Sequence, residues 1–224
     1  MSRTPFPLAA RLLAATCAAL PALVSAATVH QANIVPVATA VNDFELAPAF
    51  LANTWVQQEV RATQAFGDPG LGQMWMASGF GNGNRSWFPD GGDNGFTRLW
   101  MDDNTTIDAI AFFGGSGWLS PGQTMYYELA LDNVVVLSGS LPATFFGSWF
   151  GFAGGDFDEV RIRASQGPVN GLFDCPSGGI GGNCNFAWVD DIRVGPAVIP
   201  LPSTAWLVLP ALLLAAAGTP RRTP

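Results

Sequence analysis

The chain alternates apolar and polar residues in several short runs, and this period-two pattern predicts β-strands. In residues 157–165 the side chains of Val160, Ile162 and Ala164 share one face, and two arginines share the other. Successive side chains of a strand point to opposite faces, so such a run is typical of a half-buried antiparallel strand. We expect its apolar face to pack on a core and its arginines to face away.

A β-hairpin is predicted at residues 124–141. Two runs rich in aromatic and β-branched residues flank Asp132 and Asn133, and this dipeptide tolerates the positive φ of a tight turn. Further strands are predicted at residues 55–63, 96–101, 105–115, 147–155 and 185–195. Many short strands between Gly, Asn, Asp and Pro turns, with little helical periodicity, predict an all-β fold. We expect an antiparallel β-sandwich, and the number of strands favours a jelly roll.

The N-terminal segment, residues 1–26, has the pattern of an export signal. Arg3 and Arg11 precede an apolar stretch that ends in the small residues Ser25 and Ala26. A basic start, a short apolar run and small residues before the cut define a secretory signal peptide. The alternative is a buried N-terminal helix. The β-sandwich domain is then expected over residues 27–197.

The C-terminal segment, residues 198–224, contains a Pro-rich start, an apolar run at 205–218, and Arg221 with Arg222. The apolar run is shorter than the ~20 residues of a comfortable membrane span, and Pro210 interrupts it. It has no polar face, which argues against a core helix. We predict a hydrophobic helix that either anchors the protein weakly or is a sorting segment that is later removed.

Charge and cysteine content agree with export. The domain contains all 17 acidic residues against six arginines, a formal charge of −11, and the chain has no lysine. Such a surface repels phosphate backbones, so we do not expect nucleic-acid binding. Cys175 and Cys184 lie nine residues apart in a glycine-rich stretch. In an oxidising compartment this pair predicts a disulfide, whereas a metal site would need more Cys or His nearby.

Catalytic chemistry has few candidates. His30 is the single histidine, and no Ser-His-Asp arrangement can be built around a residue so close to the predicted signal cut. A glycosidase uses a pair of carboxylates as its catalytic residues, and pairs such as Asp102 with Asp103 are present. In an acidic protein, however, exposed carboxylates of this kind are usually only solvated charges. We therefore expect a non-enzymatic protein.

Asp190 is an acidic residue that strand parity places among apolar neighbours. In the run FAWVDDIRV it shares a face with Trp188, Ile192 and Val194. A buried carboxylate is costly unless it is paired, hydrogen-bonded or bound to a metal. Two interpretations remain open: Asp190 helps to hold a structural Ca²⁺, or it accepts backbone N–H groups at a strand bend.

Several aromatic residues lie near glycine-rich turns and could contact a glycan at a binding rim. These are Trp75, Trp87, Phe88 and Trp118.

Two short motifs resemble the ends of carbohydrate-binding-module-like jelly rolls. VNDFE at 41–45, followed by Trp55, is similar to their opening strand, and AWVDDIRV is similar to their closing strand. In that family the opening acidic residue and a closing-strand Asp often share a calcium ion. The resemblance implies Glu45 and Asp190 as ligands, with Asp43 beside them where the family usually has Gly.

The C-terminal segment resembles the PEP-CTERM sorting signal of Gram-negative bacteria, a Pro-x-Pro-Ser motif followed by an apolar helix and a short basic tail. The matching residues are Pro200, Pro202, Ser203, Arg221 and Arg222, and Leu201 replaces the usual glutamate. The upstream strand pattern also resembles cargo domains of this family. The resemblance implies export, transient residence in the inner membrane, processing by an exosortase-type membrane protease, and display at the cell surface or in a biofilm matrix.

These observations together predict an exported, surface-sorted, non-enzymatic β-sandwich protein of the cell envelope or exopolysaccharide matrix. The alternative is a carbohydrate-binding module that recognises an extracellular polysaccharide, and a glycoside hydrolase is the least favoured of the three.

Overall fold

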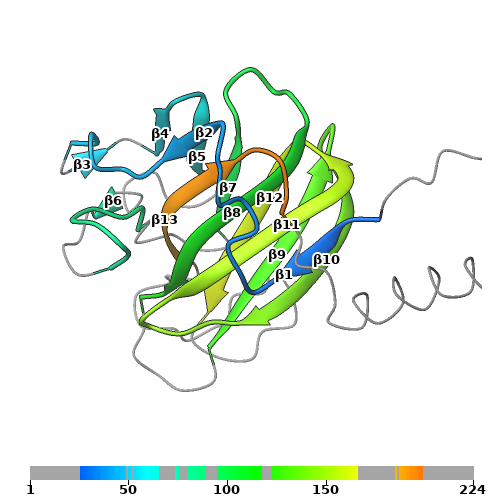
Figure 1. Ribbon diagram of the computed structural model, residues 1–224. Helices are drawn as coiled ribbons and strands as arrows, with labels where there is room; N and C mark the ends of the chain where they lie inside the picture. The colour runs from blue at the N-terminus through cyan, green and yellow to red at the C-terminus, as the bar shows by residue number, and fades with distance from the viewer. Residues whose placement is uncertain are drawn as a thin grey trace, which may run out of the picture.

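The computed structural model shows an all-β domain (Figure 1). It describes residues 26–48, 50–51, 53–65, 74–75, 80–88, 95–117, 123–165, 185 and 187–198. The strands are β1 (Thr28–His30), β2 (Ala40–Asn42), β3 (Phe50–Leu51), β4 (Thr54–Gln57), β5 (Val60–Ala65), β6 (Met74–Trp75), β7 (Phe96–Met101), β8 (Ile107–Ser116), β9 (Thr124–Leu131), β10 (Val134–Pro142), β11 (Ser148–Phe157), β12 (Glu159–Ser165) and β13 (Ala187–Val194).

Two antiparallel sheets form the body of the domain. One has five strands in the order β1-β11-β8-β13-β2, and the other has six in the order β10-β9-β12-β7-β5-β4. β3 and β6 form a separate two-stranded ladder, at the left of Figure 1. The prediction of an antiparallel β-sandwich is confirmed.

A single large core fills the space between the sheets. The six-stranded sheet contributes residues such as Leu99 and Val160, and the five-stranded sheet contributes Ile110, Phe112 and Phe150. The Phe112 and Phe150 rings stack with their centroids 5.4 Å apart. In β12, Val160, Ile162 and Ala164 all face this core, as their alternation predicts.

The outer face of the five-stranded sheet is also covered. Ile34 and Val35, from the segment that follows β1, pack on Ala109, Ala111 and Ala153. The alanines of β8 and β11 leave room for this segment because their side chains are short. The middle strand β8 therefore has apolar contacts on both faces, which explains its nearly continuous apolar sequence.

Two hairpins of the six-stranded sheet turn on residues with positive φ. Asp132 and Asn133 have φ of 50° and 65° and join β9 to β10, which confirms the predicted hairpin. The prediction of one strand over residues 55–63 is wrong, because Gln58 and Glu59, with φ of 47° and 67°, split it into the β4-β5 hairpin. Neither residue is one of the Gly, Asn or Asp types that signal such a turn.

A register shift between Asp190 and Arg193 interrupts the pairing of β13 with β8. Asp191, with φ of 48°, lies in this bulge. Before the bulge Ala187 and Val189 face the core, and after it Ile192 and Val194 do. The predicted shared core face of Asp190 and Ile192 is therefore wrong, because the extra residue reverses the parity of the strand.

Three predictions concern residues outside the described part of the chain: the signal peptide at 1–26, apart from Ala26, the disulfide between Cys175 and Cys184, and the sorting residues Pro200, Leu201, Pro202, Ser203, Arg221 and Arg222. The described residues contain no helix that could span a membrane.

Candidate functional site

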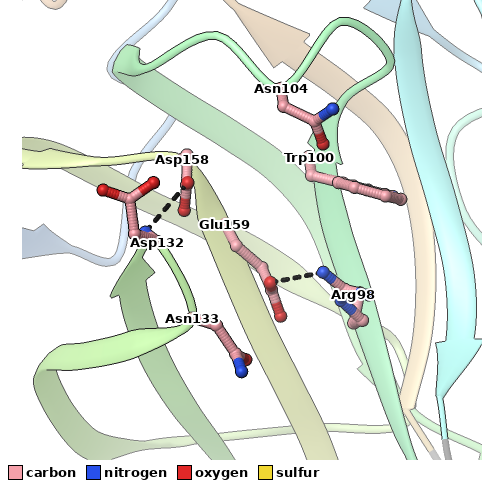
Figure 2. A pocket seen from close by; sticks show the side chains of 7 residues that line it. All are labelled: Arg98, Trp100, Asn104, Asp132, Asn133, Asp158 and Glu159. Atoms are coloured by element: carbon pink, nitrogen blue, oxygen red, sulfur yellow. Dashed lines mark hydrogen bonds and ion pairs between the residues drawn. The ribbon is translucent and has the colours of Figure 1, made fainter.

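A polar pocket of about 230 Å³ lies on the outer face of the six-stranded sheet, next to the β9-β10 turn. Its lining residues come from two strands and three turns, as Figure 2 shows: Arg98, Trp100, Asn104, Asp132, Asn133, Asp158 and Glu159. Arg98 and Trp100 alternate with the core residue Leu99 of β7, which explains why they point away from the sandwich interior.

Strand register places the charged residues of this face side by side. Glu159 of β12 pairs with Trp100 of β7, and Arg161 pairs with Arg98. On its other side β12 pairs with β9, where Arg161 lies opposite Glu128. The opposite charges of Arg161 and Glu128 attract each other across the ladder, whereas Arg161 and Arg98 carry like charges that the carboxylate of Glu159 binds together.

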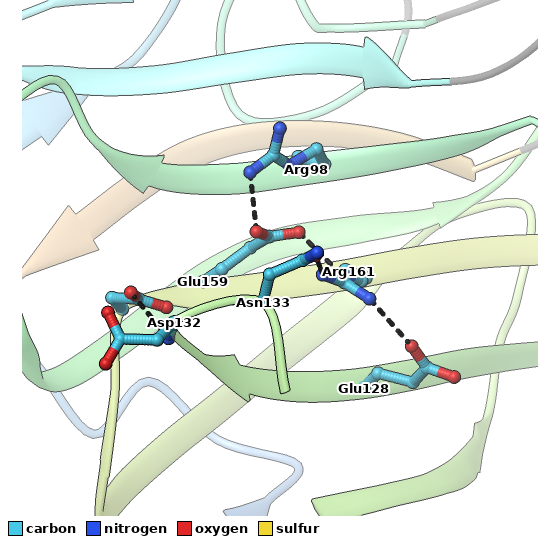
Figure 3. A network of polar contacts seen from close by, with 7 residues as sticks. Arg98, Glu128, Asp132, Asn133, Glu159 and Arg161 are labelled. Carbon is cyan, nitrogen blue, oxygen red and sulfur yellow. Dashed lines mark hydrogen bonds and ion pairs between the residues drawn. The ribbon is translucent and has the colours of Figure 1, made fainter. Parts of the chain in front are cut away.

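Glu159 is the centre of an ion-pair network (Figure 3). Arg98 Nη2 donates to its Oε2 at 2.6 Å, and Arg161 Nε donates to its Oε1 at 2.6 Å. Arg161 also donates to Glu128 Oε2 at 3.5 Å and to Asn133 Oδ1. Glu159 is only 3 % exposed, so the two guanidinium groups replace the water that a buried carboxylate would otherwise need.

The network changes the acidity of Glu159. Burial alone would raise its pKa, but hydrogen bonds and charges from Arg98 and Arg161 outweigh burial and lower the pKa below the usual value. A general acid of a glycosidase needs a raised pKa. The environment of Glu159 therefore favours a fixed anion over a proton donor.

Two arginine side chains on the same face of the sheet make cation–π contacts with the ring of Trp100. The Arg98 guanidinium carbon lies 4.4 Å from the centroid of the Trp100 ring, and that of Arg61 lies 5.5 Å away. Arg61 in turn pairs with Asp102. Cation–π contacts of this kind fix both the ring and the guanidinium groups. The wall of the pocket at Trp100 is thus preorganised.

The rim of the pocket carries polar groups available to a ligand. Asp158 Oδ2 accepts the backbone N–H of Asp132 at 3.0 Å, which fixes the turn. Within the described part of the chain, the Asp132 carboxylate and the Asn104 amide make no hydrogen bond. One arginine and three carboxylates line the pocket. It therefore offers acceptors and an amide donor to hydroxyl or amino groups and disfavours anions.

The predicted acidic ligands Glu45 and Asp190 lie together, but against the segment of residues 81–85. Asn84 and Arg85 donate their backbone N–H groups to Glu45 Oε1 at 2.6 and 3.0 Å. Asn82 donates its backbone N–H to Asp190 Oδ2 at 2.7 Å. Asp190 Oδ1 accepts the N–H of Asp191 at 2.7 Å.

Burial raises the pKa of Asp190 to about 6, although the backbone N–H groups of Asn82, Asp191 and Gly83 act in the opposite direction. Asp43 is turned elsewhere: its Oδ1 accepts the backbone N–H of Glu45 at 3.2 Å and the amide of Gln57 at 2.7 Å. Among the described residues no group of three or more His, Cys, Asp or Glu side chains could hold a metal ion. The N–H donors around Glu45 and Asp190 present positive dipole ends, so this environment does not fit a cation.

The predicted aromatic rim is only partly described. Trp87 is fully buried, with its ring centroid 6.0 Å from that of Phe44, and lies in the core instead of at a surface rim. Phe88 is half-buried and stacks on Phe80. The side chain of Trp75, in β6, and all of Trp118 are outside the described part.

The pocket residues themselves were not expected from the sequence. Arg98, Trp100, Asn104 and Glu159 are separated along the chain, and only the pairing of β7 with β12 brings them together. The alternation in β7 gives a weak signal, since FTRLWM places Arg98 and Trp100 on one face.

Comparisons with known proteins give little. No family model and no curated protein matches the chain. Among solved structures, the chain is similar to the C-terminal domain of a chitobiase from Bacteroides fragilis, with 13 % identity and a TM-score of 0.35. The alignment covers 67 % of this chain and 99 % of that one.

Proposed function

We propose that the protein is an exported, non-enzymatic jelly-roll protein of the cell envelope or exopolysaccharide matrix, which binds an extracellular polysaccharide through the pocket next to the β9-β10 turn. The observation that supports binding is the pocket itself: a cavity of about 230 Å³ whose walls are fixed by the Glu159 network, with polar groups at its rim that make no hydrogen bond to other described residues.

The chemistry of the rim favours a sugar over other small ligands. Sugar hydroxyls donate to carboxylates and both donate to and accept from amides, and the pocket offers both kinds of group in Asp132 and Asn104. A pocket that is fixed before binding loses less conformational entropy on binding. A ligand with carboxylate or sulfate groups would meet three carboxylates and is disfavoured.

Surface display is the second part of the proposal. The signal-like segment 1–26 and the PEP-CTERM-like segment 198–224 support export, transient membrane residence and release by an exosortase-type protease. Intact-mass analysis of the protein from its native host tests this part. We expect a form that starts near Ala27 and ends near Ser203, whereas a full-length membrane-bound form would contradict processing.

Binding is tested with the exported protein on an array of neutral, amino and acidic polysaccharides. We expect retention on neutral or amino polysaccharides, and a tenfold or greater loss of affinity in the Asn104→Ala and Asp132→Ala variants. The matched control is Asp108→Ala, which removes an exposed carboxylate from β8 in the other sheet. If all three variants bound as tightly as the wild type, the polysaccharide would bind elsewhere on the protein. If the wild type were not retained on any polysaccharide, the binding proposal would be wrong and a purely structural role would remain.

A further inference from the structure

We propose that Glu45 and Asp190 hold the segment of residues 81–85 by direct hydrogen bonds from its backbone, so that this carboxylate clamp takes the place of a bound calcium ion. The prediction that these two residues share a metal came from the resemblance of the two ends of the domain to calcium-binding jelly rolls. Their contacts favour the other interpretation, in which the carboxylates accept backbone N–H groups.

Glu45 contributes the first half of the clamp. Its Oε1 receives two backbone N–H groups, from Asn84 and Arg85, at 2.6 and 3.0 Å. Its Oε2 lies 3.4 Å from the side-chain nitrogen of Asn84. Hydrogen bonds to a charged acceptor are stronger than those between neutral groups, so three donors satisfy this carboxylate without a cation.

Asp190 contributes the second half. It is 1 % exposed, and each of its oxygens accepts a backbone N–H at 2.7 Å, Oδ2 from Asn82 and Oδ1 from Asp191. The β-bulge of β13 makes this geometry, because it turns Asp190 away from the sandwich core and towards residues 81–83. Asp190 and Glu45 therefore bind neighbouring parts of one short segment.

The glycines of the segment fit this close approach. A Cβ added at Gly81 would collide with the Asp190 carboxylate, and one added at Gly83 would collide with Glu45. Gly81 also has a φ of 85°, which other residues rarely adopt. Each carboxylate thus faces one glycine, Asp190 facing Gly81 and Glu45 facing Gly83. The glycine backbone occupies the space directly in front of each carboxylate.

The hydrogen-bond donors that face Glu45 and Asp190 distinguish a clamp from a metal site. Calcium takes six to eight oxygen ligands, whereas the groups that face Glu45 and Asp190 at hydrogen-bond distance are backbone and amide nitrogens. The positive ends of these N–H dipoles would repel a cation. To bind calcium, the segment would have to turn its carbonyl oxygens inward and break at least four hydrogen bonds.

The clamp has a structural consequence, since the residues on both sides of the segment that it holds contact β13 or pack on its side chains. Trp87, just beyond the clamped residues, exchanges two backbone hydrogen bonds with Val189 at 2.7 Å. Phe80, just before them, packs its ring on Phe88 and Trp188 at centroid distances of 5.6 Å. Fastening residues 81–85 therefore fixes a layer of aromatic rings on β13.

The test compares amide hydrogen exchange and thermal unfolding of the exported protein in EDTA and in millimolar CaCl₂. We expect the amides of Asn82, Asn84 and Arg85 to be protected in EDTA, and the unfolding midpoint to be the same in both buffers. Glu45→Ala should remove protection at Asn84 and Arg85 and leave it at Asn82. The control Asp108→Ala, which removes an exposed carboxylate, should leave all three protected.

Two results would overturn the clamp. One is a rise of several degrees in the unfolding midpoint on addition of calcium to the wild type. The other is fast exchange of these amides in EDTA. If the Glu45→Ala protein does not fold, a Glu45→Gln variant replaces it in the test. The amide oxygen of the glutamine still accepts N–H groups, so we expect the amides of Asn84 and Arg85 to keep partial protection in EDTA.

Discussion

Arg161 Nε lies 2.6 Å from Glu159 Oε1, and both side chains project from the same outer face of β12. They are two residues apart, so the strand itself holds the pair in register. Their side chains are 10 % and 4 % exposed, so the ion pair is nearly buried although it lies on the outer, solvent-facing side of the sheet. The energetic consequence is asymmetric, because removal of one partner leaves the other charge without compensation.

We predict that Arg161→Met destabilises the domain by about 3 kcal/mol, since breaking a buried pair costs this much. Urea unfolding at pH 7 measures the change. The matched control is Arg61→Met, which removes a pair with Asp102 whose side chains are 28 % and 43 % exposed. That exposed pair is expected to contribute less than about 1 kcal/mol. Equal losses of unfolding free energy in the two variants would show that the Glu159 network contributes no more to stability than an exposed ion pair.

The lowered pKa of Glu159 predicts a loss of stability in acid. Its carboxylate is favoured in the folded state, so its contribution is fully present above the unfolded pKa of about 4.5 and is lost as the pH falls through the lower folded value. Unfolding free energies between pH 7 and pH 3 should fall less steeply for Glu159→Gln than for the wild type. Parallel curves would show that Glu159 does not contribute to the acid loss.

Asp190 predicts the opposite dependence on pH. Its pKa is raised to about 6 in the folded state, so the folded protein binds the proton more tightly than the unfolded chain does. The contribution of Asp190 to stability therefore declines as the pH rises from about 4 to about 6. Relative to the wild type, Asp190→Asn should gain unfolding free energy over this range, and a constant difference between the two proteins would contradict the raised pKa.

The edge strand β10 predicts a tendency to associate. It has nine residues, it carries no charged side chain, and Val134, Val135 and Val136 are 66 %, 43 % and 46 % exposed. Long uncharged edges can pair with another chain, and lysine on an edge prevents this. We expect Val136→Lys to lower concentration-dependent light scattering and leave the unfolding midpoint unchanged, while Val37→Lys, at an apolar site outside the strands, has no such effect.

The strands that could be predicted are those whose signal is local. The hairpin at Asp132 and Asn133 was predicted from its turn residues, and the inward face of β12 from its alternation. The β4-β5 hairpin was missed because Gln58 and Glu59 adopt positive φ without any residue-type signal. That turn is held by pairing along the whole ladder with β7, which no short window of sequence contains.

The candidate site was harder to predict, for two physical reasons. Asp190 was correctly expected to be buried, but the β-bulge reversed its direction, and one inserted residue exchanges the two faces of a strand. Leu46 lies two residues after the buried Phe44, so strand alternation would place both on one face, yet Leu46 is 76 % exposed because the chain turns at Glu45 and Leu46. The pocket depends on contacts between strands about 60 residues apart, such as Arg98 with Glu159.

The strand pairings at the ends of the domain constrain the time at which it can fold. β1 pairs with β11, which brings Thr28 beside Ala153, and β2 pairs with β13, which brings Asn42 beside Ile192. β1 has no partner until β11 (Ser148–Phe157) is available, and β2 has none until β13, the last strand, is available; such long-range closure is slow. The five-stranded sheet therefore cannot be completed until β13, the last strand, has been synthesised, whereas the six-stranded sheet needs only the chain from Thr54 to Ser165.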